Sequence, residues 1–257
     1  MTGAVAALAE LGQAWLALGF VVFLRVGAAM ALFPAFGERS VPERVRLALA
    51  LAFTLIVAPA VAPVLEPVMA TGNWARFVLT ETLAGLAIGV VIRLFVLVLQ
   101  MAGSIAAQST SLAQIFGGAN VDPQPAMGHV LMVAGLALAV MMGLHVRLTE
   151  VLIQSYDAFR PGVLPGADLF TAWGRAHVGQ AFALAFTLAA PFVVASLIYN
   201  LALGVINRAM PQLMVAFVGA PAITAGGLLL LFLTAPLLLG LWGDGLVSLL
   251  ADPFGAP

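Results

Sequence analysis

Cysteine and lysine are both missing from the sequence, and charged residues of every kind are rare. No cysteine occurs among the 257 residues, and only 8% of them are charged. The absence of cysteine excludes disulfides, thiolate-bound metals and cysteine nucleophiles. A soluble domain is about 25% charged, whereas this chain is 63% hydrophobic with a mean hydropathy of +1.13. The composition therefore predicts an integral membrane protein that lies in a lipid bilayer.

The charges that are present nearly cancel. Ten basic residues, all of them arginine, are balanced by 11 acidic residues, so that the net charge is −1. This balance gives no basis for nucleic-acid binding or for a polybasic lipid anchor.

Motifs typical of enzymes and metal sites are also missing. The three histidines, His129, His145 and His177, are far apart, and none has a second ligand at the H-x-x-x-H spacing. No Walker-type glycine loop is present, and Ser109 and Ser111 lack the sequence context of a nucleophile elbow. We therefore expect no enzymatic activity, no metal and no cofactor.

Long apolar stretches make up most of the chain. A membrane span needs about 20 apolar residues, and lipid offers the backbone no hydrogen-bond partners, so each stretch is expected to be helical. The sequence predicts an all-α polytopic membrane protein with about six apolar helices. The expected stretches are Ala14–Phe36, Val45–Leu65, Phe77–Met101, Met127–Val146, Phe182–Ile206 and Val215–Leu239.

The connections between these stretches differ in character. Residues Ala102–Ala126 are rich in Gly, Ser, Thr and Gln, and Arg147–Gln180 form the longest and most polar connection. The arginines are shared equally between alternate connections, so the positive-inside rule assigns no orientation. Prolines in or near the ends of the stretches predict bent helices; they are Pro34, Pro59, Pro191, Pro221 and Pro236.

The first connection, Gly37–Arg46, reads as a defined helical corner. Pro42 is suited to the first turn of the next helix, and Ser40 just before it is a candidate cap. Glu43 then lies in the first turn, where its charge is favourable to the helix dipole.

Three charged residues interrupt apolar stretches. Arg25 and Arg93 lie inside them, and Glu81 lies near the start of one. An ionisable group at bilayer depth costs a few kcal/mol, so it is usually paired or in contact with water. We expect a buried ion pair or a subunit contact in preference to a proton relay, an ion site or a substrate path.

Three stretches together resemble the FliR family of flagellar biosynthetic proteins, and their order and spacing extend the resemblance over nearly the whole chain. They are ERSVPERVRLALALAF, AGSIAAQSTSLAQIFGGANVDPQ and NLALGVINRAMPQL. The last is the most specific, and its Asn-Arg-x-x-Pro-Gln pattern is closer to the flagellar branch than to the paralogous injectisome export proteins.

The resemblance implies a component of the type III protein export gate. It implies assembly with FliP- and FliQ-like subunits, cooperation with FlhA- and FlhB-like components, and passage of unfolded flagellar proteins through the complex. It also implies a location in the bacterial inner membrane at the flagellar basal body. Residues 1–180 would correspond to a FliP-like part and residues 181–257 to a FliQ-like part, built from bent helical hairpins.

Two groups of residues acquire candidate roles from this resemblance. A pore plug is expected at Ile115, Phe116, Gly117 and Gly118. Contacts to neighbouring subunits are expected at Asn200, Asn207, Arg208, Pro211 and Gln212. Buried polar groups of this kind fix the register of neighbours, because an unpaired one costs about 1–3 kcal/mol. The alternatives are an injectisome paralogue, a membrane scaffold with no conduit, and a small secondary transporter that uses Arg25, Glu81 and Arg93.

Overall fold

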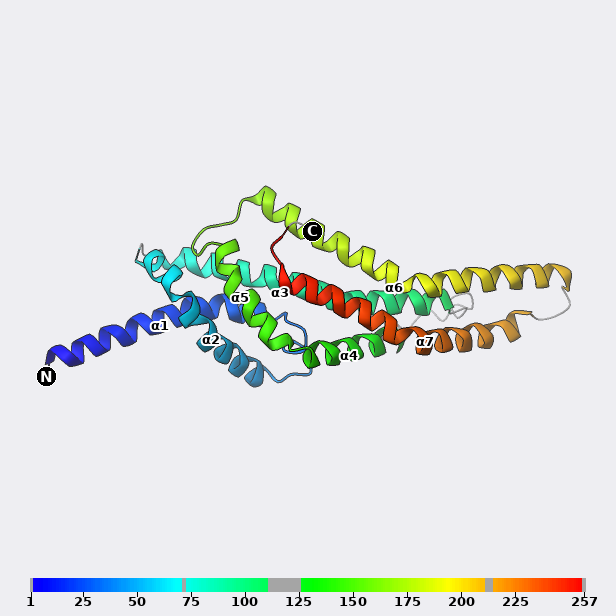
Figure 1. Cartoon of the computed structure of the whole chain (residues 1–257), viewed down its shortest axis with the longest axis horizontal. Helices are drawn as coiled ribbons and strands as arrows, with labels where there is room; N and C mark the ends of the chain where they lie inside the picture. The colour runs from blue at the N-terminus through cyan, green and yellow to red at the C-terminus, as the bar shows by residue number, and fades with distance from the viewer. Residues whose placement is uncertain (1, 71–72, 111–125, 211–214, 256–257) are drawn as a thin grey trace. The chain divides into compact units, whose positions relative to one another are not determined.

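The computed structural model describes residues 2–70, 73–110, 126–210 and 215–255, which form helices and turns and contain no strand (Figure 1). The all-α prediction is confirmed. In chain order the helices are α1 (Thr2–Met30), α2 (Glu43–Met69), α3 (Trp74–Thr110), α4 (Ala126–Met141), α5 (Leu144–Ala158), α6 (Ala167–Ala209) and α7 (Val215–Ala251).

The helices belong to two compact units that share the longer helices. The first unit contains residues 1–94, 140–178 and 248–257. The second unit contains residues 95–139 and 179–247. Each is described by its own contacts below.

Five helices among the described residues are long and apolar enough to cross a membrane: α1, α2, α3, α6 and α7. A sixth span results if α4 and α5 are counted as one broken span. The break lies at Gly143, whose φ of 82° is a left-handed conformation that glycine adopts without steric cost. The predicted number of about six apolar helices therefore agrees with the structure.

Two predicted connections are wrong in extent. Residues from Ala102 to Thr110 continue α3 instead of beginning a loop, and most of Arg147–Gln180 is helical, with only residues 159–166 outside α5 and α6. Helix α5 was missed because it is amphipathic. Its apolar residues, such as Leu148 and Val151, are buried while its charges are exposed, so no continuous apolar run marks it.

The start of α2 differs from the predicted cap. The helix begins at Glu43 with Pro42 at its N-cap, and no side chain caps it. Ser40 is two positions before Pro42, so its hydroxyl does not occupy the capping position. The guanidinium of Arg46 instead orders this corner by donating from Nη2 to the carbonyl oxygens of Glu38 and Val41, over 3.3 and 3.2 Å. Glu43 lies in the first turn, as predicted.

Prolines are accommodated inside several helices. Four of the five expected ones lie within helices, and Pro34 follows the end of α1 at Met30. Helix α2 contains Pro59, Pro63 and Pro67, α6 contains Pro191, and α7 contains Pro221 and Pro236.

In the first unit, α1 packs against α2 and α3. A side chain on Gly85 of α3 would collide with the carbonyl oxygen of Arg25 and come within 2.9 Å of the Ala28 Cβ atom. One turn later, a Cβ atom on Gly89 would lie 2.9 Å from that of Leu32. The two glycines, four residues apart, let the backbones of α1 and α3 approach closely, as their spacing predicts.

The second unit has its own aromatic centre. Trp242 of α7 is fully buried, and its indole Nε1–H donates to the carbonyl oxygen of Phe95 over 2.9 Å. Gly103 of α3 and Gly128 of α4 meet so closely that a Cβ atom on Gly103 would overlap the Gly128 backbone.

Candidate functional site

A buried ion pair lies at the centre of the first unit. Arg25 of α1 and Glu81 of α3 are both fully buried, and Arg25 Nε donates to Glu81 Oε2 over 2.8 Å. The close approach at Gly85, one turn from Glu81, brings the two helices near enough for this contact. The structure therefore joins two of the three charged residues singled out in the sequence.

The remaining donors of Arg25 are directed to α5 and to the residue that follows it. Nη1 donates to the Ser155 hydroxyl over 3.0 Å, and Nη2 donates to the carbonyl oxygen of Phe159 over 2.9 Å. Arg25 Cζ also lies 3.8 Å from the centre of the Tyr156 ring, a cation–π distance. One guanidinium thus joins α1 to α3, to α5 and to the α5–α6 connection.

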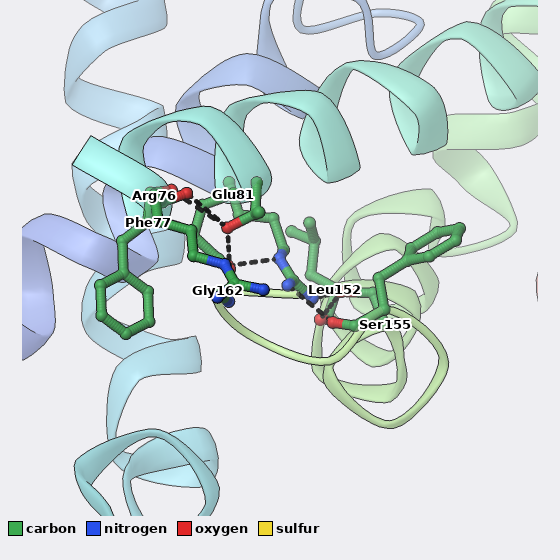
Figure 2. A network of polar contacts seen from close by, with 9 residues as sticks. Arg76, Phe77, Glu81, Leu152, Ser155 and Gly162 are labelled. Atoms are coloured by element: carbon green, nitrogen blue, oxygen red, sulfur yellow. Dashed lines mark hydrogen bonds and ion pairs between the residues drawn. The ribbon is translucent and has the colours of Figure 1, made fainter. Parts of the chain in front are cut away.

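Glu81 completes the network from the opposite side (Figure 2). Figure 2 shows Glu81, Ser155 and Gly162, from α3, α5 and the α5–α6 connection, gathered around the polar contacts. The backbone N–H of Gly162 donates to Glu81 Oε1 over 3.4 Å. Gly162 has a φ of 69°, so the turn that presents this N–H is one that favours glycine.

This geometry indicates a structural role, in which the buried ion pair holds the neighbouring segments together. Removing one partner of a buried ion pair is strongly destabilising, because the other charge is left unpaired in a medium of low polarity. With Arg25 and Glu81 fully buried, solvent and solutes have no access to these charges in the described conformation. The arrangement can hold four segments in a fixed order.

Arg93, the third charged residue, belongs to a different and shallower pair. Its Nη1 and Nη2 atoms lie 2.9 and 3.3 Å from Glu38 Oε1 and Oε2, a bidentate contact. The side chains of Arg93 and Glu38 are 30% and 21% exposed, so this pair is half-buried within the chain. The pair connects α3 to the α1–α2 corner. Glu38 lies within the corner Gly37–Arg46 and was not predicted as the partner of Arg93.

The polar residues near the end of α6 lie on its surface. Asn200, Asn207 and Arg208 are exposed, and among the described residues their side chains have no hydrogen-bond or ion-pair partner. Spacings of seven and eight residues place all three on one helical face. Gly204 lies between them with nothing within 4 Å of the position of a Cβ atom. Pro211 and Gln212 lie outside the described residues.

The expected plug residues, Ile115, Phe116, Gly117 and Gly118, also lie outside the described residues. Helix α3 is described up to Thr110, where the hydroxyls of Ser109 and Thr110 donate to the carbonyl oxygen of Ala106 over 2.8 and 3.0 Å. These contacts use the hydroxyls within the helix.

An aromatic cluster in the first unit was not predicted. The ring of Phe159 makes edge contacts with Phe170, Trp173 and Phe254, with ring centres 6.1, 5.7 and 5.5 Å apart. The cluster combines the end of α5, the start of α6 and the segment after α7. Its members are separated along the chain by up to about a third of its length, and no local pattern links them.

The described residues define a class of protein, a polytopic helical membrane protein locked by a buried ion pair and carrying unpaired polar groups on an apolar helix. A family model described as bacterial export proteins, family 1, matches residues 16–248. Flagellar biosynthetic protein FliR of Caulobacter vibrioides is 36% identical over 228 residues, which cover 87% of this chain and 90% of that protein.

More distant relatives carry the same name. Flagellar biosynthetic protein FliR of Escherichia coli is 29% identical, with 87% of this chain and 86% of the relative covered. That of Bacillus subtilis is also 29% identical, with 78% of this chain and 79% of the relative covered. The chain belongs to the FliR family of bacterial export proteins. The resemblance seen in the sequence motifs is confirmed.

Proposed function

We propose that this protein is a membrane component of the flagellar type III protein export gate. The observation that carries the proposal is its likeness to FliR proteins across 87% of the chain. In this role it would join FliP- and FliQ-like subunits to form a conduit for unfolded flagellar proteins. FlhA- and FlhB-like components would cooperate with it, in the bacterial inner membrane at the basal body.

The exposed polar face of α6 supports a role inside an assembly. Asn200, Asn207 and Arg208 have no partner among the described residues, and Leu197 and Leu201 beside them are 68% and 70% exposed. Lipid would leave the amides and the guanidinium unsatisfied at a cost of several kcal/mol per group, so another protein segment is the better environment. Subunit contacts through these residues, with Pro211 and Gln212 continuing them, satisfy this requirement.

The proposed assignment of two parts within the chain follows the family resemblance. Residues 1–180 would act as a FliP-like part and residues 181–257 as a FliQ-like part. The compact units described above reflect contacts inside this chain, whereas the proposed division concerns how each part packs with neighbouring subunits. The protein would act without a cofactor and without catalysing a reaction of its own.

A secondary transporter is the competing class. It would need Arg25, Glu81 or Arg93 to contact a solute or a proton path. Arg25 and Glu81 are fully buried in an ion pair, and Arg93 is paired with Glu38. These contacts favour a structural role for the charges and therefore the export-gate proposal. The phenotype of the gene deletion described below distinguishes a flagellar component from an injectisome paralogue.

Deletion of the gene tests the proposal. Cells without the gene should lack flagella and should not swim, whereas their growth should stay near normal. A plasmid copy of the gene should restore flagella and swimming. Electron microscopy and a swim assay measure the outcome. Normally flagellated deletion cells would reject the flagellar role and leave the injectisome or transporter alternatives.

A further inference from the structure

The aromatic cluster of the first unit lines a half-open pocket that the proposed function does not use. Its volume is 640 Å³, within the roughly 300–1,000 Å³ of small-molecule sites. Four aromatic rings line it, together with small residues that include Ala158, Ala172 and Ala176. The rings belong to Phe159, Phe170, Trp173 and Phe254, each of which is half-buried. The chain therefore leaves an aromatic surface only partly covered by its own residues.

Three hydrogen bonds hold the segments that line the pocket. The Phe159 carbonyl accepts from Arg25, and the next turn of the same connection is held by the Gly162–Glu81 contact. The indole Nε1–H of Trp173 donates to the Pro253 carbonyl oxygen over 3.0 Å, which ties the segment after α7 to α6. A pocket with fixed walls binds a ligand without the entropic cost of ordering them.

The same contacts determine which chemistry the pocket can recognise. The donor on Trp173 and the carbonyl of Phe159 are already engaged, and the Gly255 N–H donates to Asp252 Oδ1 over 2.9 Å. Among the residues that the structure describes, no charged side chain lines the pocket. A polar ligand would find few free partners, so the contacts on offer are apolar and aromatic.

The position of the pocket along the spans indicates the source of an apolar ligand. The candidate span in α6 begins at Phe170, and the one in α7 ends at Ala251. Phe170, at the first of these ends, lines the pocket together with Trp173, and Phe254, which also lines it, follows the second end by three residues. Tryptophan and other aromatic residues gather where membrane spans reach the headgroup level. Exposed charges of both signs follow closely in sequence, at Arg160, Asp168, Arg175 and Asp252.

From these observations we propose that the pocket binds the acyl chain of a membrane phospholipid near its headgroup. The rings would cover the upper part of the chain, and the surrounding charges of both signs would suit a zwitterionic headgroup. Through Phe159 and Gly162, the Arg25–Glu81 pair would serve as the support that keeps the pocket formed.

Trp173 provides a direct test in the full-length protein, because bromine atoms on an acyl chain quench indole fluorescence on contact. The chain has four tryptophans: Trp15, Trp74, Trp173 and Trp242. One variant, W15F/W74F, keeps Trp173, and a matched variant, W15F/W173F, keeps Trp74. Trp74 also lies at the end of a candidate span and is 47% exposed, but it does not line the pocket. Both variants retain the fully buried Trp242 as a common background.

Each variant is placed in nanodiscs of phosphatidylcholine brominated near the headgroup, and the fluorescence loss is compared with that in unbrominated lipid. The proposal predicts a larger loss for Trp173 than for Trp74. Filling the pocket with Ala176→Phe, or with Ala172→Leu if the first variant misfolds, should reduce the Trp173 loss to the Trp74 level. Equal losses for the two tryptophans, or a Trp173 loss that the filling substitutions leave unchanged, would overturn the proposal. A Trp173 loss that disappears when export-apparatus subunits are co-purified would also overturn it, and would assign the pocket to a protein partner.

Discussion

Arg25 and Glu81 are 56 positions apart in the chain, yet their Nε and Oε2 atoms are separated by 2.8 Å in a fully buried ion pair. The pair does more than join α1 to α3. Its outer atoms bind Ser155, the carbonyl of Phe159 and the N–H of Gly162, so the connection between α5 and α6 depends on it. The stability of the first unit and the shape of its aromatic pocket are therefore linked to one guanidinium.

Breaking the pair from one side should unfold the first unit more easily. Arg25→Ala leaves the Glu81 carboxylate buried without its partner, and Glu81→Ala does the same to the guanidinium. Each substitution is expected to destabilise the protein by about 3–5 kcal/mol. Thermal unfolding of the full chain in detergent, followed by Trp fluorescence, measures the loss.

The double variant R25M/E81L separates the effect of an unpaired buried charge on stability from the effect of altered packing. It removes both charges, so it should be more stable than either single variant. It also leaves the Phe159 carbonyl without Arg25 and the Gly162 N–H without Glu81, whereas the Ser155 hydroxyl still donates to the Leu152 carbonyl oxygen. Each unpaired group retains a cost of about 1–3 kcal/mol. Single variants as stable as the wild type would contradict the structural role of the pair.

The close approach of α1 and α3 predicts a second destabilising change. Gly85→Ala places a methyl group against the Arg25 backbone carbonyl, which cannot move aside without shifting α1. Such overpacking costs about 1–3 kcal/mol. Gly19→Ala in α1 is the matched control, because nothing lies within 4 Å of its Cβ position. The control should be neutral or slightly stabilising, and unfolding temperatures compare the two. A Gly85→Ala protein as stable as the control would show that the helices can separate at no cost.

The exposed polar face of α6 predicts the effect of substitutions on assembly. Arg208→Ala or Asn207→Leu should reduce co-purification with FliP- and FliQ-like subunits while the isolated chain keeps its stability. Arg208→Lys should restore assembly only in part, because a point charge does not replace the planar fork of donors. Arg147→Ala is the control, since Arg147 is exposed and already paired with Glu150 within its own helix. Intact complexes of Arg208→Ala in native mass spectrometry would count against subunit contacts at this face.

Local sequence patterns predict some of these helices and contacts but not others. Apolar stretches longer than a bilayer span must be helical in lipid, so the number of long helices followed from composition. Helix α5 lacks such a stretch, because its charges alternate with buried residues such as Leu148 and Val151. The charge of Arg25 pointed to a pairing, since an unpaired arginine is costly at that depth.

The identity of the partners required three-dimensional information. Glu81 pairs with Arg25, whereas Arg93 pairs with Glu38, and the spacing along the chain does not distinguish these pairings from others. Ser155 is 130 positions from Arg25 and lies in a helix that was predicted as part of a connection. The aromatic pocket combines residues from three separate segments in the same way, so no motif could indicate it.

The residues between α3 and α4 are expected to form a plug, on the basis of the sequence and the family resemblance. Ile115 and Phe116 precede Gly117 and Gly118 in a segment rich in hydroxyl and amide side chains, and Pro123 follows. A conduit for unfolded proteins has to exclude ions when it is idle, and bulky apolar groups can close a constriction by removing water from it. Deletion of Ser109–Ala119 should therefore leave the complex assembled but permeable to ions, as measured by the conductance of the purified complex in planar bilayers. The double substitution I115S/F116S keeps the segment length, so it tests the same role if the deletion prevents assembly, and I115L/F116L is the apolar control. An assembled I115S/F116S complex that stays as impermeable as the wild type would mean that these residues do not form the barrier.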